Sequence, residues 1–233
     1  MCVIFVLYQG KKENIIMPIK VGLQYIEIWK ESMEEVIQEY EKDPVQKGKI
    51  VFYGPSYYTR WSTKWGNKPL SECVLGKSGA QCCINHGFGS SCPEHQLYYY
   101  PRMIRPYEPK VLVYGCFGNS EAFGYTNEEA WELAQRVIMY TLTDFPEAEV
   151  YLVSAVRSHD ISDEQIEYRR QLNSYIKEFA EKTPRCHYLN AFDYAPLTEN
   201  DIYIPDGVHF NEKGYEAFAD FFNEALKDEL AKY

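Results

Sequence analysis

Three residues that lie far apart in the chain carry the side chains that nucleophilic catalysis by a hydroxyl group requires. Ser56 follows a Gly-Pro turn, and Asp206 stands three residues before His209. A serine hydroxyl is a poor nucleophile until a base removes its proton, and an imidazole suits that task near neutral pH. A carboxylate can fix the tautomer of that imidazole and stabilise its protonated form. These residue types predict acyl transfer, with Ser56 as nucleophile, His209 as base and Asp206 as its partner.

Neither the Gly-Pro-Ser sequence nor the Asp-x-x-His spacing identifies a catalytic site when it is taken alone. A Gly-Pro-Ser sequence is more often only a turn, because all three residues favour turns for backbone reasons. An Asp-x-x-His spacing also arises by chance in many chains of this length. The position of each segment relative to the expected strands and helices therefore decides the interpretation.

The pattern of apolar residues predicts the elements that position these side chains. Short β-rich runs alternate with longer amphipathic segments, which is typical of parallel strands joined by crossover helices. We expect strands at Lys49–Tyr53, Cys82–Asn85, Lys110–Gly115, Glu149–Ala155 and Cys186–Asn190. We expect helices at Ile28–Tyr40, Asn127–Thr143, Ser162–Lys182 and Glu212–Lys232. The predicted fold class is α/β, a three-layer α/β/α sandwich around a five-stranded parallel sheet.

The candidate residues lie at the same edge of this predicted sheet. Ser56 comes just after the first expected strand, and His209 comes immediately before the last expected helix. In open parallel sheets, ligands bind at the carboxyl ends of the strands. A single turn between Asp206 and His209 brings both side chains to one side, so we expect the three residues to meet at that edge.

Five segments, taken in order, resemble the sequence blocks of the SGNH (GDSL-like) hydrolase family. The segments are Gly54-Pro55-Ser56, Asn85-His86-Gly87-Phe88-Gly89-Ser90-Ser91, the Pro-Tyr-x-Pro-Lys strand entry within Arg105–Val113, Phe117-Gly118-Asn119-Ser120, and Asp206-x-x-His209 with its continuation Phe-Asn-Glu-Lys-Gly-Tyr. The resemblance covers roughly Gly48 to Phe222, and it depends on the order and spacing of the segments together. It implies that the predicted sandwich is flavodoxin-like.

The resemblance implies a role for each residue of the expected site. Ser56 is the nucleophile, and His209, oriented by Asp206, is the general base. The backbone N–H of Ser56, the N–H of Ser90 and the side-chain amide of Asn119 form the oxyanion hole. Such donors stabilise the charge that develops on the carbonyl oxygen in the transition state.

Four residues depart from the family's usual pattern. Pro55 replaces Asp or Ser before the nucleophile, but it removes only its own N–H and leaves that of Ser56 available. Ser90 stands where the family usually has Gly, so a left-handed backbone there is strained. Phe117 and Ser120 flank Asn119 in place of Gly and Asp. These departures concern the shape of the oxyanion pocket more than the three catalytic residues.

The predicted function is that of a serine ester hydrolase that cleaves a carboxylic ester through an acyl-enzyme intermediate and needs no cofactor. Short acyl esters are the expected substrates, with acetylated carbohydrate first among natural candidates. Tyr57 and Phe117 are expected to contact the substrate, and His159 is a further candidate. A lysophospholipase or thioesterase stays open, as does a catalytically silent binding protein with the same fold.

The charge of the chain limits the classes of partner. The formal net charge of -10 at pH 7 disfavours nucleic acid and anionic membrane surfaces, because both are polyanions. We therefore expect a small-molecule or carbohydrate ester as the partner, with a neutral or cationic substrate easier to accommodate. No stretch of the sequence is long and apolar enough to span a bilayer. The sequence does not predict the oligomeric state.

The cysteines indicate a reducing compartment. There are seven, an odd number without a CxxC pair, which predicts no disulfide framework and a cytoplasmic location. Cys83, His86 and Cys92 offer soft metal ligands, but buried structural thiols explain such positions more often, and we expect no metal.

The N-terminal segment contains a second methionine. Residues 1–16 include a short apolar run without the flanking features of a secretory signal, and Met17 opens the next segment. We expect residues 1–16 to be an N-terminal extension and residues 17–233 to form one hydrolase-like domain.

Overall fold

Five parallel strands form the central sheet of the protein. The computed structural model describes residues 26–115 and 119–233. The strands pair in the order β2-β1-β3-β4-β5, all parallel, which is the flavodoxin-like order. Their bounds are Ile50–Gly54 for β1, Cys83–Gly87 for β2, Val111–Tyr114 for β3, Glu149–Val153 for β4 and Cys186–Leu189 for β5. The predicted sheet is confirmed, with strand ends that differ by at most two residues from those expected.

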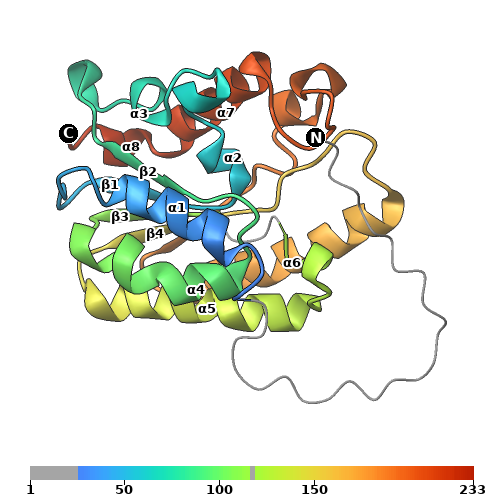
Figure 1. The fold of residues 1–233 in the computed structure, drawn as a ribbon, viewed down its shortest axis with the longest axis horizontal. Helices are drawn as coiled ribbons and strands as arrows, with labels where there is room; N and C mark the ends of the chain where they lie inside the picture. Colours follow the sequence, from blue (N-terminus) through green and yellow to red (C-terminus); the bar gives the residue numbers. More distant parts are fainter. Residues whose placement is uncertain (1–25, 116–118) are drawn as a thin grey trace.

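Helices cover both faces of this sheet (Figure 1). One face carries α1 (Lys30–Tyr40), α4 (Pro93–Met103), α5 (Asn127–Asp144) and α6 (Asp163–Lys182). The other face carries the short helices α2 (Ser56–Thr59) and α3 (Leu70–Cys73), then α7 (Glu212–Ala225) and α8 (Lys227–Leu230). The arrangement is the predicted three-layer α/β/α sandwich.

The side chains of each strand point alternately to the two faces of the sheet, and this divides the core into two apolar clusters. In β1, Val51 and Tyr53 pack beneath the face that carries α5, while Ile50 and Phe52 pack beneath the face that carries α7. Successive side chains of a strand point to opposite faces, so a strand buried on both sides reads as a continuous apolar run. This explains why the short apolar runs of the sequence predicted the sheet correctly.

Capping side chains begin the three longest helices. The side chains of Thr126 and Ser162 accept hydrogen bonds from the N–H groups three residues later and so begin α5 and α6. Asn211 caps α7 in the same way through the N–H of Gly214. The last helix was predicted to continue to Lys232, and this bound is wrong. The chain leaves helical geometry at Leu226, whose fully buried side chain packs into the core, and resumes as α8.

Glycines at the carboxyl ends of the strands let α2 pack directly on the sheet. A Cβ atom added to Gly87 would lie 2.3 Å from the backbone nitrogen of Thr59, and one added to Gly115 would lie 2.9 Å from the Tyr58 hydroxyl. Real Cβ atoms do not approach other atoms so closely. The helix that begins with Ser56 is therefore held against the ends of β2 and β3 by contacts that only glycine permits.

The predicted domain boundary at Met17 lies outside the described residues. Among the helices of residues 26–115 and 119–233, none has the length and apolar character needed to cross a membrane.

Candidate active site

Ser56, His209 and Asp206 form a continuous chain of hydrogen bonds. Ser56 Oγ lies 2.8 Å from His209 Nε2, and His209 Nδ1 lies 2.7 Å from Asp206 Oδ2. Both distances are those of good hydrogen bonds. The structure thus brings together the three side chains that the sequence predicted as nucleophile, base and orienting carboxylate. In this geometry the imidazole can accept the serine proton at one nitrogen while the carboxylate holds the proton on the other.

A tight turn fixes Asp206 against His209. Asp206 Oδ1 accepts the backbone N–H groups of Val208 and His209, both at 2.9 Å. Gly207 between them adopts a φ of 69°, a left-handed conformation that glycine takes without steric cost. Partial burial raises the pKa of the Asp206 carboxyl, but the hydrogen bonds from His209 and Val208 outweigh it, so the pKa is lowered. Asp206 therefore remains a carboxylate at neutral pH.

His209 is mostly enclosed and is held in its neutral form. Burial lowers the pKa of its imidazole, the hydrogen bond to Asp206 raises it, and the positive charge of Arg60 lowers it again. The net result is a pKa below the usual 6.5. A base of this kind is unprotonated at neutral pH and ready to accept a proton.

The segment before α2 presents Ser56 at the edge of the sheet. Pro55 has an extended backbone, and its carbonyl accepts the N–H groups of Tyr58 and Thr59, which closes the first turn of the helix. Within the described part of the chain, the N–H of Ser56 donates to no protein acceptor. The proline that replaces the family's usual residue therefore leaves this donor available for an oxyanion.

Ser90 and Asn119 lie on adjoining loops. Ser90 has a φ of 61°, the left-handed conformation for which the sequence predicted strain. Its N–H donates to no acceptor among residues 26–115 and 119–233. Asn119 Nδ2 donates to the carbonyl oxygen of Ser91 at 2.9 Å, which ties the two loops together. Since an amide has two N–H donors, one remains for a second acceptor.

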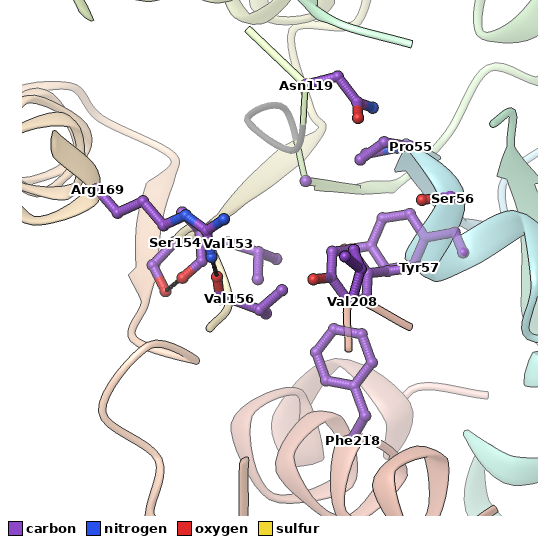
Figure 2. Close-up of a pocket in the computed structure, with 13 residues that line it drawn as sticks. Pro55, Ser56, Tyr57, Asn119, Val153, Ser154, Val156, Arg169, Val208 and Phe218 are labelled. Atoms are coloured by element: carbon purple, nitrogen blue, oxygen red, sulfur yellow. Dashed lines mark hydrogen bonds between the residues drawn. The ribbon is translucent and has the colours of Figure 1, made fainter. Parts of the chain in front are cut away.

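A pocket opens beside Ser56 at the carboxyl edge of the sheet (Figure 2). Its lining comes from the turn Pro55 to Tyr58, from Gly115 and Asn119 after β3, from residues 153–156 at the end of β4, from Val208, and from Arg169 and Phe218 on helices. Sequence analysis did not identify Arg169 or residues 153–156. The position of residues 153–156 after a strand was a usable signal, whereas nothing in the sequence of α6 marks Arg169.

The three predicted substrate contacts differ in their outcome. Tyr57 lines the pocket, and its ring centre lies 6.0 Å from that of His209. Phe117 lies outside the described residues. His159 does not line the pocket. Its Nδ1 lies 2.6 Å from Asp160 Oδ2, and its backbone N–H donates to the carbonyl oxygen of Gly207 at 2.7 Å. The backbone at position 159 thus supports the turn that carries Asp206.

The cysteine and histidine residues considered as metal ligands have other partners. Cys92 Sγ lies 3.2 Å from His95 Nδ1, and His86 Nδ1 lies 2.7 Å from the carbonyl oxygen of Met103. Throughout the described ranges, no three His, Cys, Asp or Glu side chains are grouped so that they could hold a metal ion.

Comparison with solved structures finds the same fold in proteins of low sequence identity. A GDSL-like lipase from Bacteroides thetaiotaomicron VPI-5482 has a TM-score of 0.64 at 15% identity, covering 84% of this chain and 98% of its own. The psychrotrophic esterase EstA from Pseudoalteromonas sp. has a TM-score of 0.61 at 14% identity, with 78% and 98% covered. A family 3 carbohydrate esterase from Clostridium thermocellum has a TM-score of 0.56 at 14% identity, with 79% and 98% covered.

Comparison of the amino-acid sequence with known proteins and with models of protein families identifies the family of this chain. A search of curated proteins finds no match. The model of the family described as GDSL-like Lipase/Acylhydrolase matches residues 89–222, more than half of the chain and including Asn119, Asp206 and His209. With the parallel sheet, the flanking helices and this match together, the chain belongs to the GDSL-like lipase/acylhydrolase family.

Proposed function

We propose that this protein is a serine carboxylic ester hydrolase that acts through an acyl-enzyme intermediate. The observation that carries the proposal is the hydrogen-bond chain from Ser56 Oγ to His209 Nε2 and from His209 Nδ1 to Asp206 Oδ2, at 2.8 Å and 2.7 Å. Its place at the mouth of a pocket gives an ester access to the hydroxyl. Membership of an acylhydrolase family supports the same reaction type.

The first half of the reaction forms the acyl-enzyme. Ser56 Oγ attacks the ester carbonyl carbon while its proton passes to His209 Nε2, and the carbonyl oxygen takes up the electron pair. The tetrahedral intermediate then expels the alcohol oxygen, which takes the proton from His209 Nε2 as it leaves. Asp206 stabilises the imidazolium that exists between these two transfers.

The second half releases the acid by the same route. A water molecule gives a proton to His209 Nε2 as its oxygen attacks the acyl carbon, and collapse of the second tetrahedral intermediate returns the proton to Ser56 Oγ. Each step uses only protein groups, the ester and water, so the mechanism requires no cofactor.

The oxyanion would be held by three donors. The N–H of Ser56, the N–H of Ser90 and the second amide hydrogen of Asn119 are the candidates, since none of these is committed to an acceptor in the described part of the chain. Hydrogen bonds placed before the reaction begins stabilise the developing charge without reorganisation, and removal of one such donor costs about 2.7–4 kcal/mol of transition-state stabilisation.

We propose short acyl esters as the substrates, with an acetylated carbohydrate as the first natural candidate. Val153, Val156 and Val208 give the pocket an apolar wall that suits an acyl group. The similar structure from Clostridium thermocellum is a carbohydrate esterase, which supports the carbohydrate assignment. A comparison of p-nitrophenyl acetate with p-nitrophenyl octanoate measures the acyl-length preference, and faster cleavage of the octanoate would favour the lysophospholipase or thioesterase alternative.

Labelling with a fluorophosphonate probe tests the nucleophile. Intact-protein mass spectrometry should show one adduct on the wild-type protein, none on Ser56→Ala and little on His209→Ala. Ser174→Ala is the matched control, because Ser174 is an exposed serine on α6 whose hydroxyl bonds only its own helix, and it should label like the wild type. Loss of Ser56 or His209 should lower kcat by a factor on the order of 10⁴–10⁶ without loss of folding stability.

Two results would contradict the proposal. Equal labelling of the wild type and Ser56→Ala would remove Ser56 from the mechanism. A folded wild-type protein that neither takes up the probe nor cleaves either ester would instead support a catalytically silent binding protein.

A further inference from the structure

A guanidinium group forms part of the pocket wall across from the nucleophile. Arg169 extends from α6 toward the pocket, on the side opposite Ser56 (Figure 2). Its Nη1 donates to the carbonyl oxygen of Val156 at 2.6 Å. That bond links the arginine to the segment after β4, which lines the same pocket, so the cation is held in place rather than free to turn into solvent.

Arg169 has no acidic partner in the described part of the chain. Arg60, Arg102, Arg105, Arg136 and Arg157 each pair with a carboxylate within 3.3 Å. No such pair involves Arg169, although the protein carries ten more acidic than basic residues. A guanidinium has five N–H donors, and Val156 accepts only one of the hydrogen bonds that Arg169 can donate. A half-buried cation in this position therefore retains the capacity to bind an anion.

The other residues that surround the pocket do not balance this charge. Val153, Ala155, Val156 and Phe218 are apolar, and Tyr57, Ser154 and Asn119 are polar and uncharged. A planar guanidinium can bind a carboxylate or a phosphate through two parallel hydrogen bonds. The pocket thus combines an apolar wall for a hydrocarbon group with one fixed cation.

We propose that Arg169 binds an anionic group of the ester, a carboxylate or a phosphate, and makes the protein selective for negatively charged substrates. This inference rests on the proposed ester hydrolysis, because it concerns the same pocket. It also replaces the expectation, drawn from the net charge of -10, that a neutral or cationic substrate is easier to accommodate. At physiological ionic strength the field of distant surface charges decays over about 8 Å, so the nearest charge decides local selectivity.

Matched pairs of esters test the selectivity on both sides of the scissile bond. The adipic acid mono-p-nitrophenyl ester and its carboxamide analogue differ only by a charge on the acyl side. On the alcohol side, 4-acetoxybenzoate and 4-acetoxyphenyl phosphate are compared with neutral 4-acetoxybenzamide. The wild type should cleave at least one anionic ester with a kcat/KM about tenfold or more above that of its neutral analogue, as expected for a charge-assisted contact.

Arg169→Gln should abolish this preference, so that the kcat/KM values for the anionic ester and for its neutral analogue become equal within about twofold. Arg169→Lys should keep part of the preference. Arg170→Gln is the matched control, since Arg170 is the exposed neighbour on the same helix and its loss changes the net charge equally. It should behave like the wild type.

Binding measured without turnover separates this inference from the proposed function. In a Ser56→Ala background, calorimetry should show tighter binding of the preferred anionic ester than of its neutral analogue, and adding Arg169→Gln should remove the difference. Equal affinities for every pair would overturn the role of Arg169. An equal loss of neutral and anionic ester cleavage in Arg169→Gln would also overturn it, since that result indicates only structural support of the Val156 segment. Failure of Ser56 labelling with a retained binding preference would overturn hydrolysis alone.

Discussion

Arg60 donates to the same carboxylate oxygen of Asp206 that His209 uses. Arg60 Nη1 lies 3.3 Å from Asp206 Oδ2, and His209 Nδ1 lies 2.7 Å from that oxygen. The guanidinium also stacks over the ring of Trp65, with 4.4 Å between the guanidinium carbon and the ring centre. A cation is thus fixed beside the carboxylate that orients the proposed base, and it opposes protonation of the imidazole.

The first prediction concerns the pH dependence of the wild-type enzyme. Burial and Arg60 lower the pKa of His209 below 6.5 despite the hydrogen bond that its imidazole donates to Asp206. The base must be neutral to accept the serine proton, so kcat/KM should be full above this pKa and fall as the pH drops through it. A profile with p-nitrophenyl acetate should show an acid limb centred below pH 6.5. An acid limb centred above pH 7 would contradict the assignment of His209.

The second prediction is that Arg60→Gln moves this acid limb to higher pH. The positive charge of Arg60 lowers the pKa of His209, so its removal raises that pKa. Activity near pH 6 should fall relative to the wild type, while activity at pH 8 should change little. Arg60→Lys keeps the charge and should keep the wild-type profile. An identical profile for Arg60→Gln would show that solvent screens the charge completely.

The third prediction concerns the amide of Asn119. If one N–H of this amide donates to the oxyanion, Asn119→Ala should reduce kcat roughly 10²–10³-fold and leave the KM of a small ester little changed, because that bond strengthens only as charge develops. Loss of the bond to Ser91 is a separate structural effect, and thermal unfolding of the variant measures it. A folded Asn119→Ala variant with wild-type kcat would leave the N–H groups of Ser56 and Ser90 as the only donors.

The fourth prediction uses a pair of glycines in one segment. A Cβ at Gly87 would lie 2.3 Å from Thr59 N and 2.5 Å from Tyr58 Cβ, so Gly87→Ala must displace α2 or the end of β2. We expect a loss of about 1–3 kcal/mol in the free energy of unfolding, together with reduced kcat because Ser56 moves. A Cβ at Gly89 meets nothing within 4 Å, so Gly89→Ala should match the wild type. Urea unfolding measures both, and equal midpoints for the two variants would contradict the close packing.

The sheet and the proposed triad could be predicted from the sequence because both depend on local patterns. The buried strands are continuous apolar runs, and Ser56 and His209 stand directly beside the elements that place them. Contacts between distant elements could not be predicted in the same way. Whether Arg169 reaches the pocket depends on the rotation of α6 against the sheet, and the contact of Arg60 with Asp206 joins residues 146 positions apart. The early end of α7 at Leu226 likewise depends on tertiary packing rather than on helix propensity.

The separation of Ser56 from His209 by 153 residues has a consequence for the biosynthesis of the protein. The ribosome delivers β1 and Ser56 before the other strands, whereas His209 emerges only after β5 and just before α7. A nascent chain that has exposed its first four strands holds the proposed nucleophile without its base. Under the proposed mechanism, the chain cannot cleave esters until the ribosome has translated His209, and a protease that cuts between α6 and α7 and separates the fragments ends its activity.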